Sequence, residues 1–436
     1  MKALLGLLLA AGALAAQFRA GTAKVDITPP TPVWLTGFAA RTRPATDVGL
    51  PLHAKALALE ARGARLVIVT ADLLGFTKQV TDQAAAHAAQ QHNLRRDQIV
   101  FFASHTHSGP PVTPRLTLSV GQGPEFDRAA AAYTAALTAR LSQVVTQALS
   151  ALQPATLDFG WTQATFAINR RTEHLAAIRP GETFPAPVDH RVPVLRVRTA
   201  AGAPLAVLFG YACHNTVLTG DTYEVSGDYA GYAQQALERA LPGATALFAT
   251  LCAGDQRAMP RGTRALAQQH GEALAAAVAR APVRPLAPAV ATAYEETTLA
   301  FTAHTREVYH AEAGSTDIFA ARRGRAMLAA LDAGQAVTFT PYPVQAFRLG
   351  NVTWLALAGE VVVDYALILR RRHGPNLVVA AYANDLPGYI PSQRVQREGG
   401  YEAGDSMMYF LQPGWFTEDV ETRVLAAAAR ALRGLR

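Results

Sequence analysis

The sequence predicts an α/β protein in which mixed β-sheets are flanked by helices. Short apolar runs alternate along the chain with longer segments in which Leu, Val and Ala recur at helical spacing. The chain has 436 residues, of which 50% are hydrophobic and 17% charged, as in a globular protein with an extensive core. Glycine and proline are spread along it, without a long low-complexity segment or a repeat of fixed period.

The apolar runs predict the strands, and the longer amphipathic segments predict the helices. In chain order, the predicted strands are residues 54–60, 65–71, 99–103, 192–197, 206–211, 244–251, 353–358 and 377–383. The predicted helices are residues 77–92, 126–152, 229–240, 264–279, 318–333, 361–372 and 417–433. Strands that alternate with helices in this way favour a largely parallel or mixed sheet.

The N-terminus has the pattern of a secretory signal peptide. Lys2 precedes an apolar run of roughly a dozen residues and then small residues, the order that signal peptidase requires. The run is too short for a comfortable membrane span, although an uncleaved anchor is the alternative, and no later segment reaches the ~18 apolar residues of a membrane helix. We therefore expect a signal peptide at 1–16, a single domain at 17–436 and a secreted or periplasmic protein.

The distribution of basic residues limits the kinds of partner that we expect, and the two cysteines leave two alternatives open. The formal net charge is +7, and 36 of the 40 basic residues are arginines that lie scattered along the chain. Basic stripes interleaved with aromatics would indicate nucleic acid, so we expect no nucleic-acid partner and at most peripheral contact with an anionic membrane. Cys213 and Cys252 could form a disulfide in an exported protein, or each could be a buried thiol.

Side chains suited to metal binding or proton transfer follow five of the predicted strands. They are His105 and His107, then His214, then Asp255, then Glu360, and finally Asn384, Asp385 and Tyr389. Ligands of open α/β sheets bind beyond the carboxyl ends of the strands. We therefore expect one common site, provided that one sheet edge gathers these ends.

His105 and His107 occur in the sequence Ser104-His-Thr-His-Ser108, directly after an apolar run. Residues i and i+2 of an extended segment face the same side, so both imidazoles could enter one pocket. Imidazole is both a frequent metal ligand and an acid or base near neutral pH. The alternative is a pair of hydrogen-bonded loop histidines.

Each of four other candidate residues could instead have a purely structural role. Glu360 could begin the helix predicted from residue 361, and Tyr389 could be a packed aromatic residue. Arg170 could be a surface ion-pair partner. Asp255 could be a turn residue, or an acceptor that orients a ligand histidine from behind.

Motifs in a consistent order along most of the chain resemble the catalytic domain of the neutral/alkaline, non-lysosomal ceramidase family. They are AGTAKVDITPP from Ala20, LTGF from Leu35, ADL from Ala71, SHTHSGP from Ser104, INR from Ile168, CHNT from Cys213, SGDYAG from Ser226, GDQ from Gly254, GE from Gly359 and NDLPGYI from Asn384. The resemblance implies the fold of that domain, with mixed β-sheets flanked by helices.

The resemblance also implies a zinc-dependent hydrolase of an N-acyl amide bond, ceramide-like or smaller. The family holds one zinc ion through two histidines, a glutamate and a tyrosine. Carried over motif by motif, the zinc ligands are His105, His214, Glu360 and Tyr389, the proton-transfer residue is His107 and the substrate-binding residue is Arg170. A zinc-activated water would attack the amide carbonyl, with Arg170 stabilising the oxyanion and His107 protonating the leaving amine.

Two features depart from the family. A serine follows the Gly-Asp element in characterised ceramidases, whereas Arg257 stands at the aligned position here, so a serine nucleophile is excluded at this place. Those ceramidases also carry a C-terminal immunoglobulin-like domain, and this chain ends soon after the helix predicted at 417–433. The alternatives are therefore a metal-stabilised protein that binds an amphiphile without cleaving it, and an esterase on the same scaffold.

Overall fold

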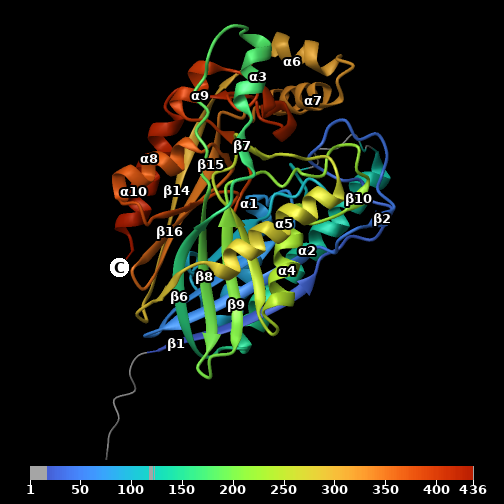
Figure 1. The fold of residues 1–436 in the computed structure, drawn as a ribbon. Coiled ribbons are helices and arrows are strands. Elements are labelled where there is room, and N and C mark those ends of the chain that lie inside the picture. The colour runs from blue at the N-terminus through green and yellow to red at the C-terminus, as the bar shows by residue number, and fades with distance from the viewer. Residues whose placement is uncertain (1–16, 117–120, 122, 436) are drawn as a thin grey trace, which may run out of the picture.

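Two β-sheets form the centre of the protein in the computed structural model, which describes residues 17–116, 121 and 123–435 (Figure 1). The larger sheet has nine strands in the order β11-β9-β8-β6-β1-β3-β4-β5, with β13 beside β6. In chain order these strands are β1 (Phe18–Asp26), β3 (His53–Ala61), β4 (Ala64–Ala71), β5 (Ile99–Ala103), β6 (Gln153–Gln163), β8 (Arg191–Thr199), β9 (Pro204–Tyr211), β11 (Thr245–Thr250) and β13 (Val283–Pro285). The pairs β4–β5 and β9–β11 are parallel and the other neighbours antiparallel, so the sheet is mixed.

The smaller sheet has five strands in the order β18-β16-β15-β14-β20. These are β14 (Val290–Ala303), β15 (Phe339–Leu349), β16 (Val352–Leu357), β18 (Val378–Ala380) and β20 (Gly414–Phe416). Three short ladders lie outside both sheets. They pair β2 (Asp47–Val48) with β10 (Glu224–Val225), β7 (Ala167–Asn169) with β12 (Gln256–Ala258), and β17 (Glu360–Val361) with β19 (Tyr389–Ile390).

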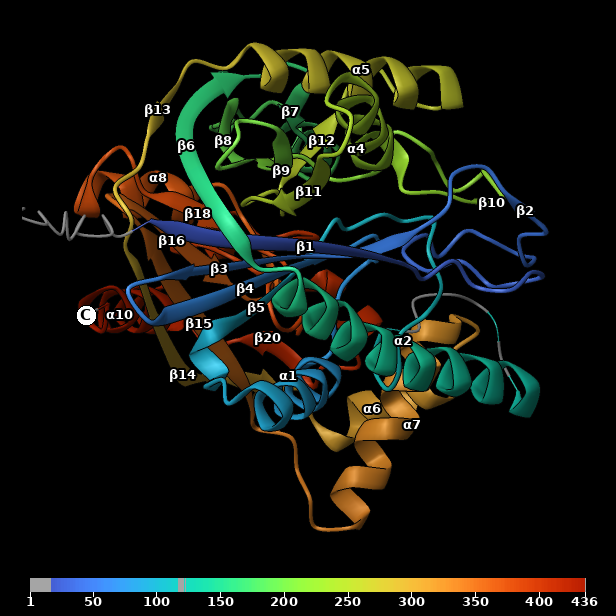
Figure 2. The same ribbon diagram turned by 90° about the horizontal axis from the view of Figure 1, so that it is seen from below.

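Helices flank the sheets, some on their faces and others beyond the strand ends (Figure 1). They are α1 (Lys78–His92), α2 (Pro124–Ser150), α3 (Arg171–Ile178), α4 (Asp228–Ala240), α5 (Arg264–Arg280), α6 (Arg306–Ala313), α7 (Ile318–Asp332), α8 (Asp364–His373), α9 (Gln393–Glu398) and α10 (Val420–Arg433). Figure 2 shows α4 and α5 on one side of the molecule, α1 and α2 on the other, and the strands of the larger sheet between them. The predicted fold class, mixed sheets flanked by helices, is therefore confirmed.

Apolar side chains from both sheets meet in one of three buried clusters. Leu57, Ile68 and Phe102 of the larger sheet share this cluster with Phe347 and Trp354 of the smaller one. The rings of Phe347 and Trp354 stack with their centroids 5.7 Å apart. Burying such large apolar surfaces stabilises the contact between the sheets, because each side chain contributes about 1.5–3 kcal/mol when removed from water.

Every strand and helix predicted from the sequence is present, with shifted ends. The helix expected at 361–372 begins only at Asp364, because the preceding residues form the short strand β17. The long strands β1, β6, β14 and β15 were not predicted, and neither were the helices α3, α6 and α9 or the strands of two or three residues other than β18. β14 shows the reason: its side chains are largely half-buried or exposed, so the strand lacks an apolar run. No helix in the described ranges has the length and apolar character needed to cross a membrane.

The two edge strands of the larger sheet, β5 and β11, approach each other at their carboxyl ends. The chain segment 380–384, which follows β18, bridges them: Ala103 N donates to Tyr382 O (3.2 Å), and Ala381 N donates to Thr250 O (3.0 Å). The hydroxyl of Thr250 also donates to Ala103 O (2.9 Å). This closure brings together chain ends that a flat sheet would hold far apart.

Candidate metal centre

His105, His107 and His214 converge where the closed sheet edge gathers its strand ends. His105 and His107 follow β5, and His214 follows β9; the two segments form a parallel bridge between Thr106 and Asn215. One nitrogen of each imidazole lies within 4.8 Å of the others, so these three histidines could hold a metal ion. His105 and His214 are fully buried, whereas His107 is partly exposed.

Glu360 and Tyr389 reach the same point from the other side. They face each other in the parallel β17–β19 ladder, where Glu360 pairs with Tyr389. Glu360 Oε2 lies 3.1 Å from His105 Nε2 and 3.0 Å from His214 Nε2. Tyr389 Oη lies 3.2 Å from His214 Nε2. The structure thus brings together all five side chains that the sequence assigned to the metal and to proton transfer.

Backbone carbonyls determine which ring nitrogen of each buried histidine faces the centre. His105 Nδ1 lies 2.7 Å from Leu74 O, and His214 Nδ1 lies 2.7 Å from Ala253 O and 3.1 Å from Gln256 O. A carbonyl only accepts, so each Nδ1 carries the proton and each Nε2 presents its lone pair to the centre. This is the tautomer that a metal-binding histidine requires.

Glu360 Oε2 and the two Nε2 atoms are therefore three acceptors around one point. The protons within reach of the imidazoles are those of Tyr389 Oη, 3.2 Å from His214 Nε2, and His107 Nε2, 3.1 Å from His105 Nε2. Glu360 Oε2 is buried and has no hydrogen-bond partner among the described residues, although two imidazole nitrogens lie close by. An arrangement of acceptors around one point is unfavourable unless a cation lies between them. The buried, unpartnered oxygen and the nitrogen and oxygen donors fit a divalent transition metal such as zinc.

The electrostatics of the centre keep the carboxyl group ionised and His214 neutral. Burial raises the pKa of Glu360, but His105 and His214 outweigh it and hold the pKa well below its usual range. Burial, with help from Arg170, lowers the pKa of His214 to about 4. Burial lowers the pKa of His107 well below its usual value, and the other two histidines add to this effect. A carboxylate beside neutral imidazoles is the protonation state in which these groups bind a metal.

Arg170 joins the tyrosine of this cluster to a buried ion-pair network. Its Nη2 donates to Tyr389 Oη and to Gly254 O, both at 2.9 Å, and its Nε donates to Glu402 (2.8 Å). Glu402 is fully buried and also accepts from Arg171 Nη1 (2.8 Å). Arg170 is thus a buried partner of the centre, not the surface ion-pair residue that was the alternative.

The carboxylate of Asp255 has hydrogen-bond partners other than the ligand histidine that it was expected to orient. We expected its carboxylate to orient a ligand histidine, but the carbonyls of residues 253 and 256 do so for His214. Asp255 Oδ1 accepts from Val363 N and Oδ2 accepts from Asn169 Nδ2, both at 2.9 Å. Burial raises the pKa of Asp255 to about 6. Through its two hydrogen bonds, Asp255 joins the segment of Val363, near Glu360, to the segment of Asn169, next to Arg170.

Arg41, which supports the loop of His107, was not among the residues singled out from the sequence. Its buried guanidinium donates to the carbonyls of His107, Thr36 (3.4 Å) and Thr222 (3.1 Å), and to Ser108 Oγ (3.3 Å). Burial lowers the pKa of Arg41 to about 10. No motif marks such a residue, because its acceptors are mostly backbone carbonyls distant in the chain.

Tyr382 and Glu402 were missed for the same reason, since both act through contacts with residues far along the chain. The Tyr382 ring lies 4.3 Å from that of His105, at a buried position with φ of 53°. Cys213 and Cys252 are both buried and free, so the disulfide considered from the sequence is not formed. The expected signal peptide at 1–16 lies outside the described residues.

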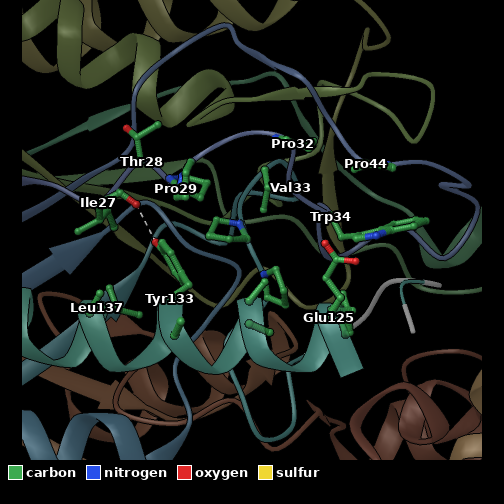
Figure 3. Close-up of a pocket in the computed structure, with 18 of the residues that line it drawn as sticks. Ile27, Thr28, Pro29, Pro32, Val33, Trp34, Pro44, Glu125, Tyr133 and Leu137 are labelled. Carbon is green, nitrogen blue, oxygen red and sulfur yellow. Dashed lines mark hydrogen bonds between the residues drawn. The ribbon is translucent and has the colours of Figure 1, made fainter. Parts of the chain in front are cut away.

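An apolar cleft of about 610 Å³ adjoins the loop that carries His107. Figure 3 shows helix α2 as one wall and the segment 27–34 as the other. Pro110 and Pro111, which follow the histidine loop, also line it. The hydroxyl of Tyr133 donates to Ile27 O (2.7 Å), so its polar group is satisfied within the wall and its ring faces the cleft (Figure 3). A volume of this size accommodates a small organic ligand or a hydrocarbon chain.

The comparisons with known proteins agree with this geometry. The family model described as neutral/alkaline non-lysosomal ceramidase, N-terminal, matches residues 18–312. The neutral ceramidase from Pseudomonas aeruginosa has a similar structure, with a TM-score of 0.73 and 18% identity over 96% of this chain and 75% of that chain. A ceramidase complexed with C2 has a TM-score of 0.75 and 18% identity, over 96% of this chain and 76% of that chain. No curated protein sequence matches the chain.

Proposed function

Because the chain belongs to the neutral/alkaline non-lysosomal ceramidase family, we propose that it is a zinc-dependent hydrolase that cleaves an N-acyl amide bond. The observation that carries this proposal is the arrangement around Glu360 Oε2, which lies within 3.1 Å of two imidazole nitrogens. Both nitrogens present lone pairs, so neither gives this oxygen a proton, and a cation between them would satisfy the buried oxygen that has no hydrogen-bond partner among the described residues. In this proposal His105, His214, Glu360 and Tyr389 hold the ion.

Zinc suits the proposed donor set of two imidazoles, one carboxylate and one phenol. It takes nitrogen and oxygen ligands, and its catalytic sites leave a position for water. When bound, it lowers the pKa of that water to about 7, which supplies a nucleophile for a carbonyl at neutral pH. Hydrolysis then adds water across the C–N bond and releases a carboxylic acid and an amine.

His107 is the proposed carrier of the proton to the leaving nitrogen. Its Nε2 lies 3.1 Å from His105 Nε2, so its ring borders the centre, and it is partly exposed where a substrate can approach. An amide nitrogen leaves only after it is protonated, because an amine anion is a very poor leaving group. Because its pKa lies well below the usual value, His107 is neutral near pH 7 and would take a proton from the attacking water before it passes one to the nitrogen.

Arg170 is the proposed stabiliser of the oxyanion. Its Nε and Nη2 are already engaged, which leaves Nη1 without a hydrogen-bond partner in the described part of the chain. Glu402 holds the guanidinium plane, so the remaining donors are in place before substrate binds. Asp255 contributes as a positioning residue, through the segments that it fastens.

The proposed substrate is a lipid amide with a hydrocarbon chain. The likeness to a ceramidase complexed with C2 supports an amphiphilic substrate. The apolar cleft supports it independently, because its walls continue into the loop of His107. Thr36 N donates to Gly109 O (3.0 Å), which joins the segment lining the cleft to the histidine loop. We therefore place the hydrocarbon chain in the cleft.

Metal analysis of the purified protein tests the ligand assignment. Zinc content is measured for the unaltered protein, His105→Ala and His214→Ala, with His87→Ala as control. His87 lies on the exposed side of α1 and bonds only to Gln91. We expect about one zinc per chain in the unaltered protein and the control and a marked loss in the other two. Undiminished zinc in both ligand variants would refute the assignment.

A substrate panel tests the reaction. N-acyl amides and the corresponding esters are incubated with the zinc-loaded protein, and products are followed by mass spectrometry. Release of amine that stops on chelation supports the amide hydrolase. Tight binding without a zinc-dependent product would favour the amphiphile-binding protein, and cleavage of esters alone would favour the esterase.

Export and domain organisation complete the proposal. We propose that residues 1–16 are a signal peptide, that residues 17–436 form one catalytic domain and that the protein is secreted or periplasmic. N-terminal sequencing of protein recovered from the periplasm or medium checks the cleavage. Recovery only from the cytoplasm with Met1 intact would contradict export.

A further inference from the structure

Loop 216–222 borders the open side of the metal centre. His107 is the partly exposed histidine, and its ring lies 4.8 Å from that of Phe38. Phe38 in turn meets this loop, because a Cβ placed on Gly220 would lie 3.6 Å from Phe38 Cβ. A substrate that reaches His107 from solvent therefore passes near loop 216–222.

Two arginines flank the start of this loop. Arg257 forms a parallel backbone bridge with His214, one of the proposed ligands. Arg261 Nη1 lies 3.5 Å from Thr216 O, and Gly262 N donates to Val217 O (2.7 Å). Arg257 and Arg261 thus both belong to the strand and turn that run beside residues 214–217.

The side chain of Arg257 points away from the protein core. It lies between Gln256 and Ala258 on β12, and both neighbours are buried, so the pleat directs Arg257 to the opposite face. Its Nη2 pairs with Glu173 at 2.5 Å, and the Glu173 side chain is 53% exposed. Its Nε is buried without a hydrogen-bond partner among the described residues. A ligand can therefore replace or join Glu173 at Nη2, and a small movement of the side chain would bring the buried Nε into contact with the same ligand.

Arg261 supplies a charge that the structure leaves unmatched. Arg170 is paired with Glu402, and Arg257 with Glu173, but no carboxylate in the described ranges lies within ion-pair distance of Arg261. Burial lowers the pKa of Arg261, and the positive charges of Arg257 and Arg170 lower it further; the carboxylates of Glu173 and Asp228 act in the opposite direction and offset only part of this shift. The three guanidiniums thus repel one another across a half-buried space, and one added negative charge relieves this repulsion.

We propose that Arg257 and Arg261 bind a carboxylate on the amine side of the scissile bond, so that the substrate is an N-acyl amino acid. This inference rests on the proposed amide hydrolysis. A guanidinium binds a carboxylate through two parallel hydrogen bonds, and one unmatched charge suits one carboxylate. In an N-acyl amino acid this group is separated from the scissile nitrogen by a single carbon. It must therefore lie close to the metal centre, and the backbone of Arg257 is bridged to that of the proposed ligand His214.

The test compares two substrates that differ only in this group, N-dodecanoyl-alanine and N-dodecanoyl-alaninol. Release of dodecanoic acid from each is measured with the zinc-loaded full chain, and the ratio of the two kcat/KM values is the readout. We expect the unaltered protein to prefer the carboxylate by about ten- to a hundredfold. We expect Arg257→Ser and Arg261→Ala to reduce this ratio, and Arg257→Lys to retain part of it. Arg264→Ala is the matched control, because Arg264 pairs with Glu224 and should leave the ratio unchanged.

Equal kcat/KM values for the two substrates in the unaltered protein would overturn the proposal, as would a ratio that neither arginine variant changes. Direct binding to the zinc-loaded His107→Ala protein, measured by calorimetry, separates this proposal from the proposed reaction. Binding of N-dodecanoyl-alanine that depends on Arg257, with cleavage of neither compound by the unaltered protein, would uphold the carboxylate site and refute the hydrolase. Cleavage of the alcohol alone would uphold the hydrolase and refute the carboxylate site.

Discussion

Glu360→Gln should affect the metal-free and the zinc-loaded protein in opposite directions. In the metal-free protein above the pKa of imidazole, Glu360 Oε2 faces the lone pairs of His105 Nε2 and His214 Nε2 at 3.1 and 3.0 Å. A glutamine nitrogen in the same place carries two hydrogens, one for each imidazole. Two new buried hydrogen bonds at about 1 kcal/mol each would stabilise the metal-free fold by at most about 2 kcal/mol, and by less where Tyr389 Oη or His107 Nε2 donates to the same nitrogen.

The corresponding changes in melting temperature are measurable. An unfolding entropy of about 2.1 cal/mol/K per residue amounts to about 0.9 kcal/mol/K for the whole chain, so 2 kcal/mol corresponds to about 2 °C. Zinc at a thousand times its Kd stabilises the unaltered protein by about 4 kcal/mol, or about 4–5 °C. The variant lacks the charged ligand and should lose most of this increment.

Scanning calorimetry at pH 8 on chelator-treated and zinc-loaded samples measures both effects. Glu272→Gln, an exposed position on α5, controls for the change of charge. We expect the Glu360→Gln protein to melt higher than the unaltered protein without metal and lower with it. A lower melting temperature without metal, or a full zinc increment in the variant, would refute the idea that unshared lone pairs meet at this point.

Four further outcomes test other parts of the structure. His107→Ala should keep its zinc and lose about 10²–10⁴-fold in kcat, whereas a loss of zinc on elemental analysis would make His107 a ligand instead. Glu402→Gln leaves buried arginine charge uncompensated, so calorimetry should show about 3–5 kcal/mol of destabilisation together with reduced kcat; a change below 1 kcal/mol would contradict the network. Burial raises the pKa of Asp228 from 3.8 to about 6, so the folded chain holds this proton more tightly than the unfolded chain, and stability should fall by about 3 kcal/mol as pH rises from about 4 to 6. Asp228→Asn should remove that part of the slope in denaturant titrations, and an unchanged slope would assign it elsewhere. Ala132→Trp should fill the apolar cleft and raise KM for long-chain amides only, while Ala131→Trp, whose side chain is exposed outside the cleft, should not; equal effects would argue against a chain in the cleft.

The sequence placed the site better than it placed the sheets. His105, His214 and Asp255 each follow a strand with an evident apolar run, and the carboxyl ends of such strands are where sites form. The resemblance added Glu360 and Tyr389, which lie on two-residue strands too short to show any periodicity. β14 escaped prediction because only part of its length faces the core.

Contacts between distant segments account for the residues that were missed. Arg41 supports the His107 loop through backbone carbonyls, which leave no trace in the identity of the residues that supply them. Glu402 lies 232 positions from Arg170, and nothing in either local sequence identifies the other. Asp255 was assigned to the correct region with the wrong partner, because two carbonyls close to it in the chain already serve His214.

Because the metal centre depends on segment 380–384 and its neighbours, it is completed late in chain synthesis and folding. The histidine loop emerges early, but Glu360 and Tyr389 follow it by more than half the length of the chain, and the backbone hydrogen bonds of this segment to both edge strands form only after it has been synthesised. Contacts of such large sequence separation form slowly. A chain still being synthesised therefore carries histidines but no complete centre. Zinc binding would therefore indicate that folding is complete. Loss of zinc would indicate that the C-terminal third has unfolded.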